Sequence, residues 1–132
     1  MTKRIFVVDD EAHIRHIVSM KLANAGYDIV TAEDGEEALE LCQSEKPDLI
    51  ITDYQMPYVT GLEMCHKLRA QSETRDIPVL MLTARDFDIE PQEMAAAGIS
   101  DVLSKPFSPR EVLKRVQELI GEPETEAVAE SS

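Results

Sequence analysis

Short apolar runs alternate with amphipathic stretches along almost the whole chain. Three of the runs are apolar at nearly every position, as in strands that are buried on both faces of a parallel sheet. A shorter run lies between Asp28 and Glu33, which favours an edge of the sheet. The predicted strands are Ile5–Val8, Ile29–Ala32, Leu49–Thr52, Val79–Leu82 and Val102–Ser104.

The stretches between these strands have the spacing and the end signals of helices. Apolar residues recur at intervals of three and four, as along Ile14–Ala25, and a weaker helix is predicted over Gln92–Ala97. Asp34 precedes another such stretch and can cap it. The last helix is the best specified, because Ser108 and Glu111 have the spacing of a capping box.

Five βα units in a row predict one α/β domain, with a parallel sheet between two layers of helices. The length of 132 residues suits a single domain. The composition changes after Gly121, because residues 122–132 contain four glutamates and no basic residue. We therefore expect a folded domain over 1–121 and a disordered acidic tail over 122–132.

The charge balance restricts the partners. The chain has 13 Lys and Arg against 26 Asp and Glu, a net charge of −13, so nucleic acid and anionic membranes would repel it.

The first apolar run stops at two aspartates and is too short for a signal peptide or a membrane span. Cys42 and Cys65 form no CxxC motif and are predicted to be buried apolar residues. We expect a cytoplasmic protein without nucleic-acid or membrane partners.

Polar residues follow four of the five predicted strands. They are Asp9 and Asp10, Asp53, Thr83, and Lys105. Ligands of open parallel sheets bind at the carboxyl ends of the strands, where these side chains would meet. Three carboxylates there repel one another unless a cation lies between them, and oxygen ligands of this kind suit Mg²⁺.

A carboxylate beside Mg²⁺ can be a nucleophile toward a phosphoryl group, with Lys105 and Thr83 neutralising and binding the transferred charge. Each residue also has a simpler interpretation. Asp9 and Asp10 can favour a helix N-terminus, Asp53 can be a turn residue, and Lys105 can be a solvated charge. Their joint placement at strand ends favours the site.

Four segments resemble the receiver domain of the two-component response-regulator family, the CheY-like domain. They are Val7–Glu11, Leu49–Pro57, Leu82–Ala84 and Ser104–Phe107, and with their spacing they cover residues 4–121. The resemblance implies a doubly wound, flavodoxin-like sheet of five parallel strands in the order 2-1-3-4-5, with helices on both faces.

The resemblance also implies a metal site and a phospho-acceptor. Asp53 would accept a phosphoryl group from the histidine of a sensor kinase, from a histidine phosphotransfer protein or from a small acyl phosphate. Asp10 would bind Mg²⁺ directly and Asp9 mostly through water. Asp53 and the backbone carbonyl of Gln55 would complete the protein's ligands.

The remaining implied roles concern the phosphoryl group. Lys105 would pair with its oxygens, and the bond from Lys105 to Pro106 would be cis. Thr83 would move toward the phosphoryl group and report its presence. Ala84 matches the small residue that lets the group approach.

Four positions modify this pattern. Val102 stands where the family often has Tyr or Phe, so an aromatic switch is doubtful and the signal would pass through Thr83 and the backbone. Gln55 and Arg85 occupy variable positions that influence the lifetime of the phosphoryl group. Arg85 can approach that group or point to solvent. Thr60 replaces a common acid and can cap the next helix.

We expect a stand-alone phosphorylation switch that promotes its own phosphorylation and dephosphorylation but is not a turnover enzyme. The resemblance implies that output is contact with an unknown protein target through the fourth helix, fifth strand and fifth helix, by a monomer or a phosphorylation-dependent dimer. One alternative is a docking scaffold that needs no phosphorylation. Another is an aspartate-nucleophile phosphatase, which Gln55 disfavours because a general acid is needed there. His13 and His16 are expected to be exposed polar residues.

Overall fold

The computed structural model describes residues 2–83 and 90–123. Strands and helices alternate along the chain, as the hydrophobic pattern predicts. The elements are β1 (Arg4–Val8), α1 (Ala12–Asn24), β2 (Asp28–Ala32), α2 (Gly35–Ser44), β3 (Leu49–Asp53), α3 (Gly61–Arg69), β4 (Val79–Thr83), α4 (Pro91–Ala97), β5 (Asp101–Ser104) and α5 (Pro109–Ile120).

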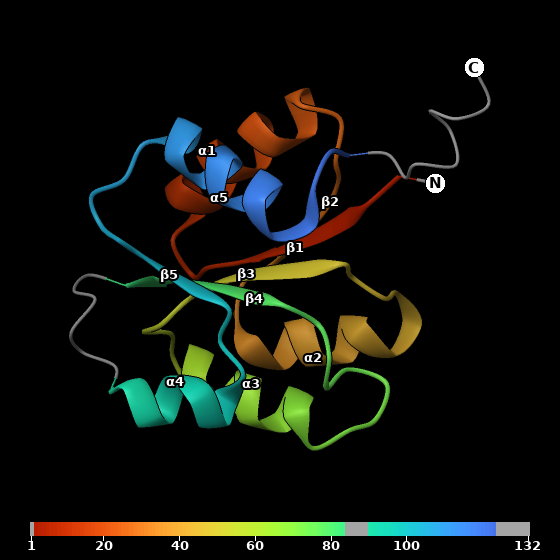
Figure 1. Cartoon of the computed structure of the whole chain (residues 1–132), viewed down its shortest axis with the longest axis vertical. Helices are drawn as coiled ribbons and strands as arrows, with labels where there is room; N and C mark the ends of the chain where they lie inside the picture. The colour runs from red at the N-terminus through yellow and green to blue at the C-terminus, as the bar shows by residue number, and fades with distance from the viewer. Residues whose placement is uncertain (1, 84–89, 124–132) are drawn as a thin grey trace.

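The five strands form one parallel sheet in the order β2-β1-β3-β4-β5. Helices α1 and α5 cover one face, and α2, α3 and α4 cover the other (Figure 1). The doubly wound fold, the strand order and the edge position of β2 are confirmed. The order reverses between β1 and β3, which is where ligands of such sheets bind.

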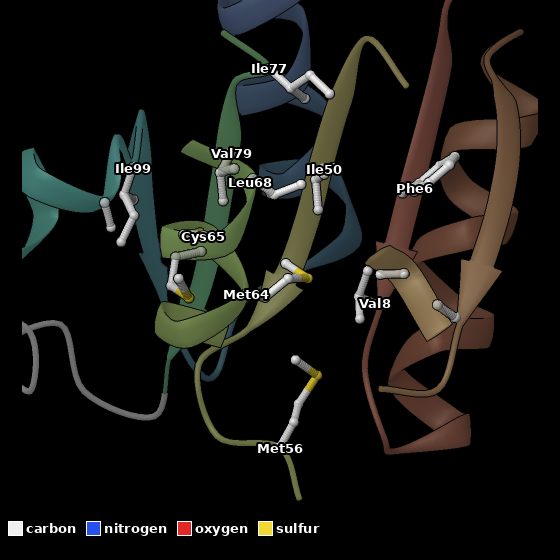
Figure 2. Packing of buried hydrophobic residues seen from close by; sticks show 14 residues of the cluster. Phe6, Val8, Ile50, Met56, Met64, Cys65, Leu68, Ile77, Val79 and Ile99 are labelled. Atoms are coloured by element: carbon white, nitrogen blue, oxygen red, sulfur yellow. The ribbon is translucent and has the colours of Figure 1, made fainter. Parts of the chain in front are cut away.

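Each face of the sheet has its own hydrophobic core, because alternate residues of a strand point to opposite faces. Phe6 and Val8 of β1 pack with α2–α4 residues such as Met64, as Figure 2 shows. Ile5 and Val7 pack on the opposite side against α1 and α5. Strands β3 and β4 are buried at every position, as expected for central strands that helices cover on both faces.

Helix ends follow the predicted capping residues. The backbone N–H of Glu37 donates to the Asp34 carboxylate, and Thr60 forms a capping box with Glu63. Ser108 and Glu111 form the predicted box at the start of α5, with Pro109 in its first turn. Helix α1 differs, because the Glu11 side chain at its N-cap position makes no capping hydrogen bond.

One arginine joins α3 to its neighbours. The Arg69 guanidinium donates to the carbonyls of Ala97 and Gly98 at the end of α4, and to those of Thr74 and Arg75 after α3. These four hydrogen bonds tie the C-terminal end of α4 to α3 and to the loop after it. This end of α4 lies away from the strand ends that carry Asp53 and Thr83.

The described chain continues two residues past Gly121. The backbone N–H of Lys3 donates to the Pro123 carbonyl at 2.7 Å, and the Tyr27 hydroxyl donates to the Gly121 carbonyl at 2.5 Å. The rest of the expected tail, residues 124–132, lies outside the described residues. Among the helices of residues 2–83 and 90–123, none has the length and apolar character needed to cross a membrane.

The surroundings of the two cysteines and of His13 and His16 indicate no reactive or metal-binding role. Both cysteines are free thiols; Cys65 is buried in the core and Cys42 is half-buried. Burial raises the pKa of each thiol to about 11, so both are poor nucleophiles. His13 and His16 are exposed, as expected.

Candidate functional site

Three carboxylates meet at the carboxyl ends of β1 and β3. Asp53 is the last residue of β3, while Asp9 and Asp10 follow β1 directly. One carboxylate oxygen from each lies within 4.8 Å of the others. Asp9 and Asp53 are buried and Asp10 is exposed. The structure therefore brings together the three acids that the sequence placed at this sheet edge.

Asp9 shows that the cluster suits a cation. Its Oδ1 atom accepts the backbone N–H of Glu11 at 2.9 Å, whereas its Oδ2 atom is buried without a hydrogen-bond partner among the described residues. Burial raises the pKa of Asp9 to about 6, and the nearby charge of Asp53 adds to this. An unpartnered buried carboxylate oxygen beside two further carboxylates is a donor set that Mg²⁺ fits.

Lys105 brings a positive charge close to Asp53. Its Nζ atom lies 3.4 Å from Asp53 Oδ1 and 3.5 Å from Glu11 Oε1. Burial raises the pKa of Asp53, while Lys105 opposes that rise. Burial is the largest single influence and lowers the pKa of Lys105, but the contact with Asp53 and the negative charges of Asp53, Asp9 and Glu11 together outweigh it. The net shift of the pKa is upward.

The backbone at Lys105 is hydrogen-bonded to the end of β4. The Lys105 N–H donates to the Thr83 carbonyl at 2.7 Å, and the peptide bond to Pro106 is cis, as expected. Thr83 is the last residue of β4, is 1% exposed and pairs in register with Ser104. Asp53, Thr83 and Lys105 therefore come from three adjacent strand ends.

The loop after Asp53 lies close against that residue. A Cβ atom on Gly61 would stand 2.3 Å from the Asp53 carbonyl oxygen, so a larger residue requires the chain to move. The Gly61 N–H donates to the Tyr54 carbonyl at 2.9 Å. This close approach holds the loop that contains Gln55, whose side chain is exposed.

Other expected site residues have different outcomes. Val102 is half-buried and packs against the core between the sheet and α2–α4. Ala84 and Arg85 lie outside the described residues. The metal-binding role of the Gln55 carbonyl stays a prediction. Glu11 was not predicted to contact Lys105, and only its place directly after Asp9 and Asp10 could have indicated it.

An apolar cleft of about 360 Å³ adjoins the site. It lies between α1 and the connection from β5 to α5, and Glu11 and Lys105 form its rim toward Asp53. Its apolar lining consists of Ile14, Ile17, Val18, Pro106, Phe107 and Pro109. A group bound in this cleft would lie beside the charged residues at the sheet edge.

Comparisons with known proteins agree with this geometry. Residues 5–117 match the sequence model of the response regulator receiver domain. The alkaline phosphatase synthesis transcriptional regulatory protein PhoP of Bacillus subtilis is 45% identical over 120 residues, which are 91% of this chain and 49% of PhoP. The chain spans about half the length of the curated relatives it matches.

Two solved structures share the fold and sequence similarity. The chemotaxis response regulator CheY4 of Vibrio cholerae is 40% identical, with a TM-score of 0.84 over 90% of this chain and 99% of that one. The receiver domain of the sensor histidine kinase PA1611 from Pseudomonas aeruginosa is 27% identical, with a TM-score of 0.82 over 92% of this chain and all of that one. The latter structure holds a magnesium ion coordinated in its active-site cleft.

Proposed function

Because the chain belongs to the response regulator receiver domain family, we propose that it is a Mg²⁺-dependent switch that accepts a phosphoryl group on Asp53. The observation that carries this proposal is the position of Asp53, which lies in the carboxylate cluster and 3.4 Å from Lys105 Nζ. Asp9, Asp10, Asp53 and the Gln55 carbonyl would hold the ion. Bound there, Mg²⁺ would neutralise charge on the transferred group.

The proposed reaction is a displacement at phosphorus. An oxygen of the ionised Asp53 carboxylate forms the new bond to phosphorus. The bond from phosphorus to the donor atom breaks, and the donor leaves with the electron pair. The donor atom is an imidazole nitrogen of a phosphohistidine or an oxygen of acetyl phosphate. The Lys105 ammonium binds the phosphoryl oxygens, and Thr83 supplies a hydroxyl group at the neighbouring strand end.

The phosphorylated state would end when water displaces Asp53 from phosphorus. The protein would then promote one transfer and one hydrolysis per signal, without behaving as a turnover enzyme. Gln55 supports this proposal over an aspartate-nucleophile phosphatase, because a glutamine two residues after the nucleophile is no general acid. Steady hydrolysis of a phosphomonoester would contradict it.

The apolar cleft supports a protein as the phosphodonor. A sensor histidine kinase or histidine phosphotransfer protein could place an apolar side chain between Ile14 and Phe107 while its phosphohistidine reaches Asp53. Exchange of Ile14 for Asp should then slow transfer from such a protein. Phosphorylation by acetyl phosphate, which needs no docking surface, should keep its rate.

The downstream contacts are proposals as well. We propose that α4, β5 and α5 form the output face, where Arg115 and Asp101 make an ion pair of 2.7 Å. PhoP is named a transcriptional regulatory protein, and this chain covers about half of it, so the absence of nucleic-acid partners stays a prediction. The stand-alone organisation, the cytoplasmic location, the absence of membrane contact and the oligomeric state stay predictions too.

Incubation with Mg²⁺ and acetyl phosphate tests the central proposal. Intact mass spectrometry should find one added phosphoryl group on the protein and none on Asp53→Asn. Omission of Mg²⁺ should abolish the adduct. An unchanged mass of the wild-type protein, or an adduct that persists in Asp53→Asn, would sink the proposal.

Signal propagation can be tested at Thr83 and Val102. Because Val102 has no ring to rotate, a phosphoryl mimic should shift the Thr83 amide signal in NMR spectra more than the Val102 signal. A larger shift of the Val102 signal would contradict the proposal that the signal passes through Thr83. A protein that is phosphorylated without any shift beyond Asp53 would favour the docking scaffold.

A further inference from the structure

Glu11 occupies a helix N-cap position but does not cap its helix. Its backbone is extended, with φ −87° and ψ 111°, and its side chain makes no hydrogen bond to the first turn of α1. Glutamate is not among the residues that cap well, because its longer side chain fits the geometry poorly. The carboxylate extends instead toward Lys105.

Lys105 stands between two carboxylates and is held closely by neither. Its Nζ atom is 3.5 Å from Glu11 Oε1 and 3.4 Å from Asp53 Oδ1. Charge-assisted hydrogen bonds between nitrogen and oxygen are shorter, about 2.7–2.9 Å. The ammonium is therefore shared between the two carboxylates, and a movement of Nζ away from Glu11 would weaken that pair.

We propose that Glu11 is a positioning residue that competes with the phosphoryl group for Lys105. This inference rests on the proposed function of Asp53. A phosphoryl group on Asp53 attracts the Lys105 ammonium, whose pairing with Glu11 must weaken as it moves. Glu11 thereby lowers the affinity of the site for the phosphoryl group and shortens the time for which Lys105 stays on it.

Two substitutions separate the contact from the charge. Glu11→Gln removes the negative charge and the ion pair together. Glu11→Asp keeps the charge, but aspartate is a good N-cap residue, so its carboxylate should turn to the first turn of α1 and release Lys105. Glu36→Gln is the matched control, because Glu36 is exposed in the first turn of α2 at the same sheet edge.

The experiment measures the affinity of each variant for beryllofluoride, a phosphoryl mimic, in the presence of Mg²⁺. Titrations are followed through the Thr83 amide signal, and melting temperatures confirm that each variant is folded. The Glu11 side chain is 60% exposed and that of Lys105 is 23% exposed, so solvent weakens the pair, and Glu11→Gln should bind the mimic about two- to five-fold more tightly. Glu11→Asp should bind it more tightly by a similar factor, while Glu36→Gln should match the wild type.

The outcomes distinguish the inference from the function on which it rests. Equal affinities for all four proteins would overturn the role of Glu11 and leave the phospho-acceptor intact. The role of Glu11 would also be overturned if Glu11→Asp bound the mimic with the affinity of the wild type. Loss of the negative charge alone would then explain the tighter binding by Glu11→Gln. If Glu36→Gln bound the mimic more tightly by the same factor as Glu11→Gln, the effect would be one of overall charge, and the role of Glu11 would be overturned. A wild-type protein that neither binds the mimic nor accepts a phosphoryl group would overturn both proposals.

Discussion

Exchange of Asp9 for Asn should stabilise the metal-free protein. Asp9 is 1% exposed, and the pKa of its carboxyl group is raised from 3.8 to about 6, because burial disfavours its charge. Asparagine has the same shape and keeps an oxygen for the Glu11 N–H, but it carries no charge. Its amide group can also donate to the neighbouring carboxylates.

The size of the effect follows from the two pKa values of Asp9. The difference between 3.8 in the unfolded chain and about 6 in the folded one corresponds to at most about 3 kcal/mol. Below pH 3.8 the carboxyl group is neutral in both states and carries no penalty. As the pH rises through about 6, the folded state must ionise it, so this stability is lost and the full penalty applies above that pH.

Urea unfolding with a chelator present measures this directly. At neutral pH, Asp9→Asn should exceed the wild type in free energy of unfolding, and its melting temperature should be higher by on the order of 10 °C at most. The advantage should shrink as the pH falls toward 4. Added Mg²⁺ should stabilise the wild type more than Asp9→Asn, because only the wild type offers the third carboxylate.

Two results would refute the reasoning about Asp9. One is a variant that is no more stable than the wild type at neutral pH without metal. The other is a stability difference that does not change between pH 4 and pH 7, because a buried ionisation must leave a pH dependence. Either result would mean that water or structural relaxation solvates the carboxylate, and that the cluster does not need a cation.

Substitutions at three further positions test the scaffold, each by urea unfolding. Gly61→Ala places a Cβ atom 2.3 Å from the Asp53 carbonyl oxygen and should cost about 2 kcal/mol or more; an unchanged stability would show that the loop moves freely. Ser108→Ala removes the capping box with Glu111 and should cost about 1 kcal/mol, whereas Ser108→Thr should cost less. Arg69→Met deprives four backbone carbonyls of a donor and should cost about 2 kcal/mol, with faster hydrogen exchange in α4; uniform exchange would contradict its local role.

The fold and the acidic cluster were predictable because their signals are local. Two-sided apolar runs such as β3 mark buried parallel strands, and the residues directly after them must lie at one sheet edge. Asp53 and Thr83 proved to be the final residues of their strands, one position further than the apolar pattern indicated. The capping boxes were also local, since they depend on spacings of three residues.

The contacts that the sequence did not reveal join segments far apart in the chain. The approach of Glu11 to Lys105 depends on how the connection after β5 lies beside α1. The apolar cleft arises from the same packing. The close contact of Gly61 with the Asp53 carbonyl depends on the path of a loop that has no periodic pattern. Pattern and spacing alone cannot supply such three-dimensional relations.

The shared rim of the apolar cleft and the carboxylate site has a thermodynamic consequence. Glu11 and Lys105 face both, so a group that fills the cleft and a phosphoryl group on Asp53 act on the same ion pair. If either shifts that pair, the two binding free energies are coupled, and the coupling is the same in both directions. A partner that binds the unphosphorylated protein more tightly must then lower the affinity for the phosphoryl group by the same factor, so transfer itself would promote the partner's release.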